Sequence, residues 1–281
     1  METLKIWYTD FWPEWKDEDF ITPILARNYD IVLDRNKPDI LFHSIFNRMS
    51  DSPNYNCKKV LFLGENYRPE QFKSNYSISF DPHSGINFRL PLWQVYLLKN
   101  PELKTRLFTG RKLQDFQNWN AMVVSNSGNF FRNSLFELLN EYKRVKSYGR
   151  YHNNDQELIK ASQGKYWRDA KDEFFQSHTH KFMMAVENSP YRYYCTEKLM
   201  DAFLANSLPI YWGDPRVSED WNEKSFINGS KINILETVKK IDNDKALFNA
   251  MFLEPVFTDL QKQNLEENLD NFEKWLNHII L

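Results

Sequence analysis

A polar, aromatic loop near residue 190 separates two apolar runs and carries residue types that bind an anion. The runs, residues 182–186 and 208–212, have the length of buried strands, and a helical pattern begins between them near Thr196. In such a strand–helix–strand unit, the loop after the first strand opens at the start of the helix, where free N–H groups and the helix dipole attract negative charge. Five candidate side chains are gathered here: Glu187, Asn188, Tyr194, Glu197 and Lys198. This grouping predicts a site for a phosphate-bearing ligand.

The same residues also have an ordinary structural interpretation. Thr196 is a typical helix N-cap, Glu197 is a common first-turn acid, and Lys198 could lie in solvent. The location favours function, because α/β sheets usually bind ligands beyond the carboxyl ends of their strands. Cys195 in this loop could act as a nucleophile, but its small apolar side chain also suits packing, and we favour packing.

Two further side chains stand at the ends of predicted strands. Glu65 lies in the turn Gly64-Glu65-Asn66, directly after an apolar run, where a carboxylate is either functional or an ordinary turn residue. Arg132 stands in the first turn of a predicted helix, residues 132–143, which follows a predicted strand at residues 121–125. A cation at the start of a helix opposes the dipole unless an anion is bound in front of it. The alternative is an exposed arginine paired with Glu137 or with solvent.

The elements that must position these side chains alternate along the chain. Short apolar runs and helical stretches follow one another through both halves, which favours two mostly parallel α/β domains. We expect one domain over residues 1–112, a second over residues 113–255, and a C-terminal helix over residues 256–281. That helix has one apolar and one acidic face, which predicts docking on the body of the protein rather than on an anionic membrane.

Composition excludes several classes of function. The 281-residue chain is 42% hydrophobic and 16% aromatic, so it can fold around one large core or two smaller ones. Its net charge of −2 gives no support for non-specific nucleic-acid binding. No apolar run has the length of a membrane span and the amino terminus lacks a secretory pattern, so we expect a cytoplasmic protein. Two cysteines do not indicate a disulfide framework.

Patterns for metals and dinucleotides are weak or missing. His178 and His180 have no third ligand at a recognisable spacing. The acidic pairs at residues 17–19 and 242–244 do not follow a buried strand. The chain has no Gly-x-Gly-x-x-Gly fingerprint, which argues against a dinucleotide oxidoreductase. We therefore expect no required metal and no cofactor.

The order of these residues resembles the α1,3/4-fucosyltransferases, the GDP-fucose-dependent enzymes of glycosyltransferase family 10. The resemblance covers most of the chain and is specific in a few segments: Glu187-Asn188-Ser189, a six-residue step from Asn188 to Tyr194, Thr196-Glu197-Lys198, Pro209-Ile210-Tyr211-Trp212-Gly213, Lys224-Ser225-Phe226-Ile227, the Arg132 segment and Gly64-Glu65-Asn66. In one place the chain departs from the family, because Tyr67 stands where bacterial members often have a second glutamate.

The resemblance implies a GT-B fold, in which two Rossmann-like domains face each other across a cleft, with C-terminal helices. It places the acceptor on the first domain and GDP-fucose mainly on the second. The implied reaction is inverting transfer of L-fucose from GDP-β-L-fucose to a hydroxyl of an N-acetylglucosamine- or glucose-containing glycan. The linkage is α1,3, with α1,4 left open.

The resemblance also implies the role of each site residue. Glu65 is the general base, and Arg132 and Lys198 bind the diphosphate. The donor pocket is completed by four residues, Glu187, Asn188, Tyr194 and Glu197. The implied partners are GDP-fucose and an oligosaccharide or lipopolysaccharide glycan, without nucleic acid, and peripheral contact with the inner face of a membrane stays open. The alternatives are a transferase for another GDP-sugar and a non-catalytic glycan-binding relative.

Overall fold

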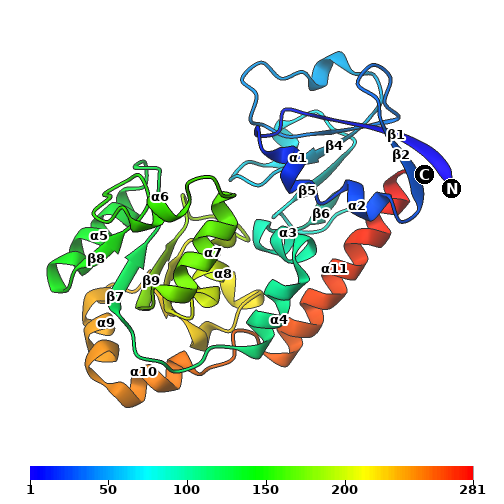
Figure 1. Cartoon of the computed structure of the whole chain (residues 1–281). Coiled ribbons are helices and arrows are strands. Elements are labelled where there is room, and N and C mark those ends of the chain that lie inside the picture. Colours follow the sequence, from blue (N-terminus) through cyan, green and yellow to red (C-terminus); the bar gives the residue numbers. More distant parts are fainter. Residues whose placement is uncertain (281) are drawn as a thin grey trace. The chain divides into compact units, whose positions relative to one another are not determined.

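Two parallel β-sheets organise the chain, each in its own structural unit (Figure 1). The computed structural model describes residues 1–280, apart from the side chain of Asp17 in the acidic turn at residues 17–19. Unit 1 consists of residues 1–101 and the C-terminal stretch from Gln263, and unit 2 consists of residues 102–262.

The sheet of unit 1 has six strands in the order β2-β1-β3-β4-β5-β6, all parallel. Their bounds are β1 Glu2–Thr9, β2 Tyr29–Leu33, β3 Ile40–His43, β4 Lys58–Phe62, β5 Tyr76–Ser79 and β6 Asn87–Arg89. Every residue of β3 is buried. Central strands of a parallel sheet are covered on both faces, which explains why the apolar runs here are continuous rather than alternating.

The helical elements of unit 1 are short except for two. They are α1 Trp15–Glu18, α2 Thr22–Leu25, η1 Ser52–Asn54, η2 Pro69–Gln71, α3 Leu92–Lys99 and most of α11 Asp259–Ile280. The apolar face of α11 contributes Phe272, Leu276 and Ile279 to the core of unit 1. The C-terminal helix therefore packs on this unit, as its two-faced pattern predicts.

The sheet of unit 2 has five parallel strands in the order β11-β10-β9-β7-β8. Their bounds are β7 Asn118–Met122, β8 Val145–Ser147, β9 His180–Val186, β10 Leu208–Trp212 and β11 Ile227–Asn228. The helical elements are α4 Pro101–Thr109, α5 Phe130–Tyr142, α6 Glu157–Ala161, α7 Trp167–Ser177, α8 Glu197–Leu204, η3 Val217–Glu219, η4 Glu223–Ser225, α9 Ile234–Asn243 and α10 Lys245–Phe252. Helices α9 and α10 follow one another directly (orange in Figure 1).

The unit boundary lies earlier than the expected break after residue 112. Helix α4 belongs to unit 2, since Arg106 pairs with Asp172 at 2.5 Å and donates to the Leu204 carbonyl at 3.1 Å. The next segment is anchored by Arg111, which is buried and donates to the Ser207 and Ser225 carbonyls at 3.1 and 2.9 Å. These tertiary contacts make the segment part of the second unit.

Three further segments take their form as follows. Residues 88–93 form the end of β6 and the start of α3, and residues 150–171 contain α6 and the start of α7. Helices α9 and α10 are separate, because Asp244 ends α9 and its side chain caps α10 by accepting from the Leu247 N–H at 3.0 Å.

Candidate functional site

The candidate anion site lies at the carboxyl edge of the unit 2 sheet. Strands β7 and β9 are parallel neighbours, so the segments that follow them, Asn129 at the start of α5 and Glu187 before α8, meet at this edge. The Asn129 side chain donates to the carbonyls of Glu187 and Asn188, at 2.8 and 3.1 Å. The two candidate segments predicted from sequence are therefore brought together.

Glu187 is fully buried and connects β9 to the start of α8. Its Oε1 accepts from the Thr196 N–H at 2.7 Å, and its Oε2 accepts from the Thr196 hydroxyl at 2.7 Å and from Lys198 Nζ at 3.0 Å. Lys198 Nζ also donates to the Thr196 hydroxyl at 2.8 Å. Both oxygens of Glu187 thus point toward α8, so it positions Lys198 instead of facing solvent.

The two carboxylates beside Lys198 have opposite electrostatic behaviour. Burial raises the pKa of Glu187, while the Lys198 charge opposes this. Burial would also raise the pKa of Glu197, but Lys198 and Lys171 outweigh it and lower that pKa to about 2. Glu197 lies 3.9 Å from Lys198 Nζ, and the two side chains are 22% and 20% exposed. The start of α8 therefore presents an ionised acid and a partly accessible cation.

Arg132 is held at the start of α5, behind the loop that follows β9. Its N–H donates to the N-cap side chain of Asn129 at 3.0 Å, and its guanidinium donates to Asn188 Oδ1 at 3.1 Å and to the Asn126 carbonyl. No carboxylate of the described residues forms an ion pair with it. Burial lowers the pKa of Arg132, and the Glu187 charge opposes this.

The burial of Arg132 limits how it can act. The residue is only 1% exposed, and its Nε is buried without a hydrogen-bond partner among the residues that the structure describes. A direct contact with a diphosphate requires the guanidinium to become exposed. In its present position Arg132 orients Asn188, which is half-buried, and supplies positive charge from behind it.

Tyr194 and Cys195 lie inside the protein. Each is 1% exposed, and they follow Tyr193, which has a left-handed backbone conformation at φ 66°. The Tyr193 N–H donates to Asp214 Oδ1 at 2.7 Å, which holds this turn. Burial raises the pKa of the Cys195 thiol, so packing rather than nucleophilic chemistry fits this residue.

Gly213, directly after β10, packs closely against the side chain of Glu187. A Cβ atom at this position would lie 2.3 Å from Glu187 Cγ and 2.7 Å from its Cβ. No side chain can therefore be added at residue 213 without moving the carboxylate that holds Lys198. The close approach gives a physical reason for glycine in the Pro-Ile-Tyr-Trp-Gly segment.

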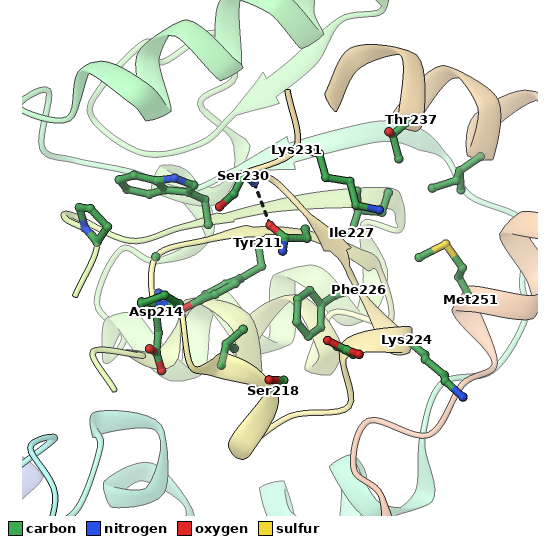
Figure 2. A pocket seen from close by; sticks show the side chains of 18 of the residues that line it. Tyr211, Asp214, Ser218, Lys224, Phe226, Ile227, Ser230, Lys231, Thr237 and Met251 are labelled. Carbon is green, nitrogen blue, oxygen red and sulfur yellow. Dashed lines mark hydrogen bonds between the residues drawn. The ribbon is translucent and has the colours of Figure 1, made fainter. Parts of the chain in front are cut away.

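A cavity of about 1120 Å³ lies next to Gly213, and its lining residues include Trp212 and Gly213. Figure 2 shows Lys224, from η4, and Lys231, from the turn after β11, among the side chains that line this cavity. In that turn the Ser230 N–H donates to the Asn228 side chain at 2.9 Å.

Glu65 follows β4 in unit 1 and is half-buried. Its turn is braced by Arg68, which donates to the Asn66 side chain and pairs with Asp81 at 2.6 Å. The Glu65 carbonyl accepts from the Tyr67 N–H at 2.7 Å. The candidate base thus stands on an ordered turn at the carboxyl edge of the first sheet.

Several supporting residues were missed by sequence reasoning. Asn129 had a recognisable signal, an N-cap residue three positions before Arg132. Asp201 had none: it joins α8 to α7 by ion pairs with Arg168 at 2.9 Å and with Lys171. These ion pairs depend on how α7 and α8 pack against each other, which cannot be predicted from local sequence.

The described residues contain no group of three His, Cys, Asp or Glu side chains that could hold a metal ion. His180 lies 3.0 Å from the Tyr148 hydroxyl and 2.8 Å from the His178 carbonyl, which are structural contacts. No helix within the described chain is both long and apolar enough to cross a membrane.

Two family models match the chain. The N-terminal domain model of alpha-(1,3)-fucosyltransferase FucT matches residues 6–96, and the C-terminal model of glycosyltransferase family 10 (fucosyltransferase) matches residues 114–264. The first match falls within unit 1, and the second falls almost entirely within unit 2. The second match alone covers more than half of the 281 residues.

Individual relatives agree with these matches. The alpha-(1,3)-fucosyltransferase FucT of Helicobacter pylori is 26% identical over 266 residues, with 80% of this chain and 53% of the relative covered. An alpha-(1,4)-fucosyltransferase of Arabidopsis thaliana is 34% identical over 74 residues, which cover 25% of this chain and 18% of the relative. The chain thus spans about half the length of the Helicobacter relative and less of the plant relative.

Solved structures show the same fold. A crystal structure of an α1,3-fucosyltransferase with GDP has a TM-score of 0.73 at 25% identity and covers 98% of this chain and 91% of that chain. A second, with GDP-fucose, has a TM-score of 0.70 at 24% identity, with 98% and 90% covered. The expected α/β fold of the GT-B type is therefore confirmed.

Proposed function

The chain belongs to glycosyltransferase family 10, the fucosyltransferases, and from that membership we propose an inverting transfer of L-fucose. The donor is GDP-β-L-fucose, and the acceptor is a hydroxyl of an N-acetylglucosamine- or glucose-containing glycan. The proposal rests on one observation at the start of α8: buried Glu187 holds Lys198 in place beside the Arg132 segment. Solved relatives with GDP and GDP-fucose support the choice of donor.

The donor half of the mechanism concerns the departing diphosphate, which gains negative charge as the glycosidic bond breaks. Lys198 is one-fifth exposed and fixed by Glu187 and Thr196, so it can meet this charge without reorganising. Arg132 adds positive charge from the neighbouring helix start. Fixed cations at these positions can stabilise the leaving group, and the proposal therefore includes no divalent ion.

The acceptor half requires a base. An acceptor hydroxyl must lose its proton as it attacks the anomeric carbon, and a carboxylate within hydrogen-bond reach can accept it. We assign this role to Glu65 because its turn resembles the family's Gly-Glu-Asn segment. A single in-line displacement inverts the configuration and gives an α-linked product.

Glu197 is the group that we assign to the donor's sugar or ribose. Its low pKa keeps it ionised, so it can accept hydrogen bonds from hydroxyl groups and favour positive charge on the reacting ring. Asn188, held by Arg132, completes this side of the donor pocket. The buried Tyr194 supports the loop from within.

The test is incubation of the purified protein with GDP-fucose and a glycan panel that includes oligosaccharides and a lipopolysaccharide glycan, followed by mass spectrometry and linkage analysis. GDP-mannose serves as the matched donor, and a parallel reaction contains a chelator. Fucosylated product at equal rates with and without chelator supports the proposal. Preferential use of GDP-mannose would indicate another GDP-sugar transferase, and GDP binding without any turnover would indicate a non-catalytic relative.

The proposal also places the protein in the cytoplasm. Cys57 and Cys195 are both free thiols, and Cys195 is buried. Free thiols are compatible with a reducing compartment.

A further inference from the structure

An aromatic cluster lies under the carboxyl edge of the unit 1 sheet. Phe11 stacks on Trp15 with ring centroids 3.9 Å apart, and both pack against Phe62, the last residue of β4. Most of this cluster is core. Two rings at its outer side are more accessible to solvent than the others: Trp12 is only partly buried, and Phe46 is 43% exposed.

Trp12 and Phe46 come from different loops and form a pair. Trp12 follows β1 and Phe46 follows β3, and their rings meet edge to face with centroids 5.2 Å apart. Trp12 is also fixed from below by Trp15 at 5.2 Å and Phe62 at 6.2 Å. The pair is thus a supported aromatic surface rather than two freely rotating side chains.

The loop that carries Phe46 is held by Asp10. This residue is 6% exposed and has a left-handed backbone at φ 64°, an uncommon conformation that the surrounding structure must maintain. Its carboxylate accepts from the Ser50 hydroxyl at 2.6 Å and from the N–H groups of Asp51 and Ser52 at 3.0 and 3.2 Å. Its carbonyl accepts from the Phe46 N–H at 2.8 Å.

The aromatic pair shares its edge of the sheet with the candidate base. Strands β1, β3 and β4 are parallel neighbours, so the loops bearing Trp12, Phe46 and Glu65 all leave the same edge. Phe62 contacts Trp12 and stands three residues before Glu65. Ligand sites in α/β sheets lie at this edge, and fixed aromatic rings there offer apolar area with little loss of side-chain entropy on binding.

We propose that Trp12 and Phe46 form a subsite that binds a pyranose ring of the acceptor glycan, resting on the fucosyltransferase function proposed above. A pyranose has an apolar face of C–H groups, which packs on aromatic rings, and hydroxyl groups at its edge, which need polar partners. The exposed side chain of Arg48 lies two residues after Phe46 and supplies such a partner. The neighbouring Asn47 amide is used within the loop, because it donates to Asp10 Oδ1 at 3.3 Å and accepts from the Met49 N–H at 3.2 Å. Asp10 is the positioning residue that keeps the loop in place.

The first test is kinetic and uses N-acetyllactosamine as acceptor. Phe46→Ala should raise the acceptor KM about tenfold, the effect of losing one aromatic contact. It should leave the KM for GDP-fucose and the acceptor-independent hydrolysis of GDP-fucose unchanged, because the donor residues lie in unit 2. Trp12→Phe, which keeps the aromatic packing, should show a smaller increase. Leu33→Ala is the matched control, since Leu33 is 60% exposed at the end of β2 on the same edge but has no ring.

The second test measures sugar binding without any reaction. Saturation-transfer NMR should show contact between the wild-type protein and N-acetyllactosamine that is lost in Phe46→Ala and kept in Leu33→Ala. If the wild type transfers fucose while Phe46→Ala and Trp12→Phe keep its acceptor KM and NMR contact, the subsite is refuted and the transferase function stands. If the wild type shows no turnover of GDP-fucose but binds the sugar through Phe46, the subsite stands and the transferase function fails.

Discussion

Replacing Gly213 with alanine perturbs the donor site through one added carbon. The new Cβ would lie 2.3 Å from Glu187 Cγ, about 1 Å closer than ordinary van der Waals contact, and 3.0 Å from the Tyr211 hydroxyl. Glu187 is fully buried, so its side chain has no open space into which it can turn. The substitution must therefore move the carboxylate, the backbone of the loop, or both.

The expected loss of stability follows from the hydrogen bonds that Glu187 accepts. Three groups donate to the Glu187 carboxylate, at 2.7, 2.7 and 3.0 Å. A hydrogen bond to a charged group contributes about 1.5–3 kcal/mol, and overpacking a well-packed site costs about 1–3 kcal/mol. If relaxation of the loop preserves some of the contacts, the free energy of unfolding should fall by about 2–4 kcal/mol. The misplaced Lys198 should lower kcat/KM about 100-fold.

Urea unfolding measures the loss of stability, and fucose-transfer kinetics together with calorimetric titration of GDP measure the effect on the donor site. Gly85→Ala is the matched control, because a Cβ at residue 85 meets no atom within 4 Å. The control should behave as the wild type in these assays. Wild-type stability together with wild-type GDP affinity in Gly213→Ala would refute the view that Glu187 organises the start of α8.

Three further predictions concern single groups. Lys198→Ala should weaken turnover by about 2–4 kcal/mol in transition-state stabilisation, whereas Lys160→Ala, an exposed lysine of α6, should have no effect in the same kinetic assay. Glu65→Gln should keep GDP binding in calorimetry and lose transfer, and transfer at the wild-type rate would exclude it as the base. Burial lowers the pKa of His180 to about 4, below its ordinary value of 6.5, so the unfolded chain takes up this proton first. The free energy of unfolding should therefore fall by up to about 3 kcal/mol as the pH drops from 6.5 to 4, and His180→Gln should reduce that slope in urea unfolding.

The sheets were largely predictable from sequence because their central strands are continuous apolar runs. Strands β4, β9 and β10 were expected close to their observed positions. Strand β11 is only two residues long and exists through its pairing with β10, so no local pattern marks it. The break between α9 and α10 depends on the cap formed by Asp244, which periodicity alone does not reveal.

Sequence could predict which residues come together at the site, but not how their side chains are oriented. Parallel strands bring their carboxyl ends to one edge, which is why Arg132, Glu187 and Lys198 could be expected together. Sequence could not show that Glu187 points inward to Thr196, or that Arg132 is almost completely buried. Both facts depend on how side chains of α5, β9 and α8 pack together, and α5 lies far from the other two elements along the chain.

We propose that Lys198 at the start of α8 holds the diphosphate of the donor, while the buried Arg132 at the start of α5 adds positive charge from behind Asn188. A crystal structure of the protein with GDP tests this placement. We expect phosphate oxygens within hydrogen-bond distance of Lys198 Nζ, with Arg132 behind Asn188. GDP bound elsewhere, for example in the cavity beyond Trp212, with the start of α8 unoccupied, would contradict it.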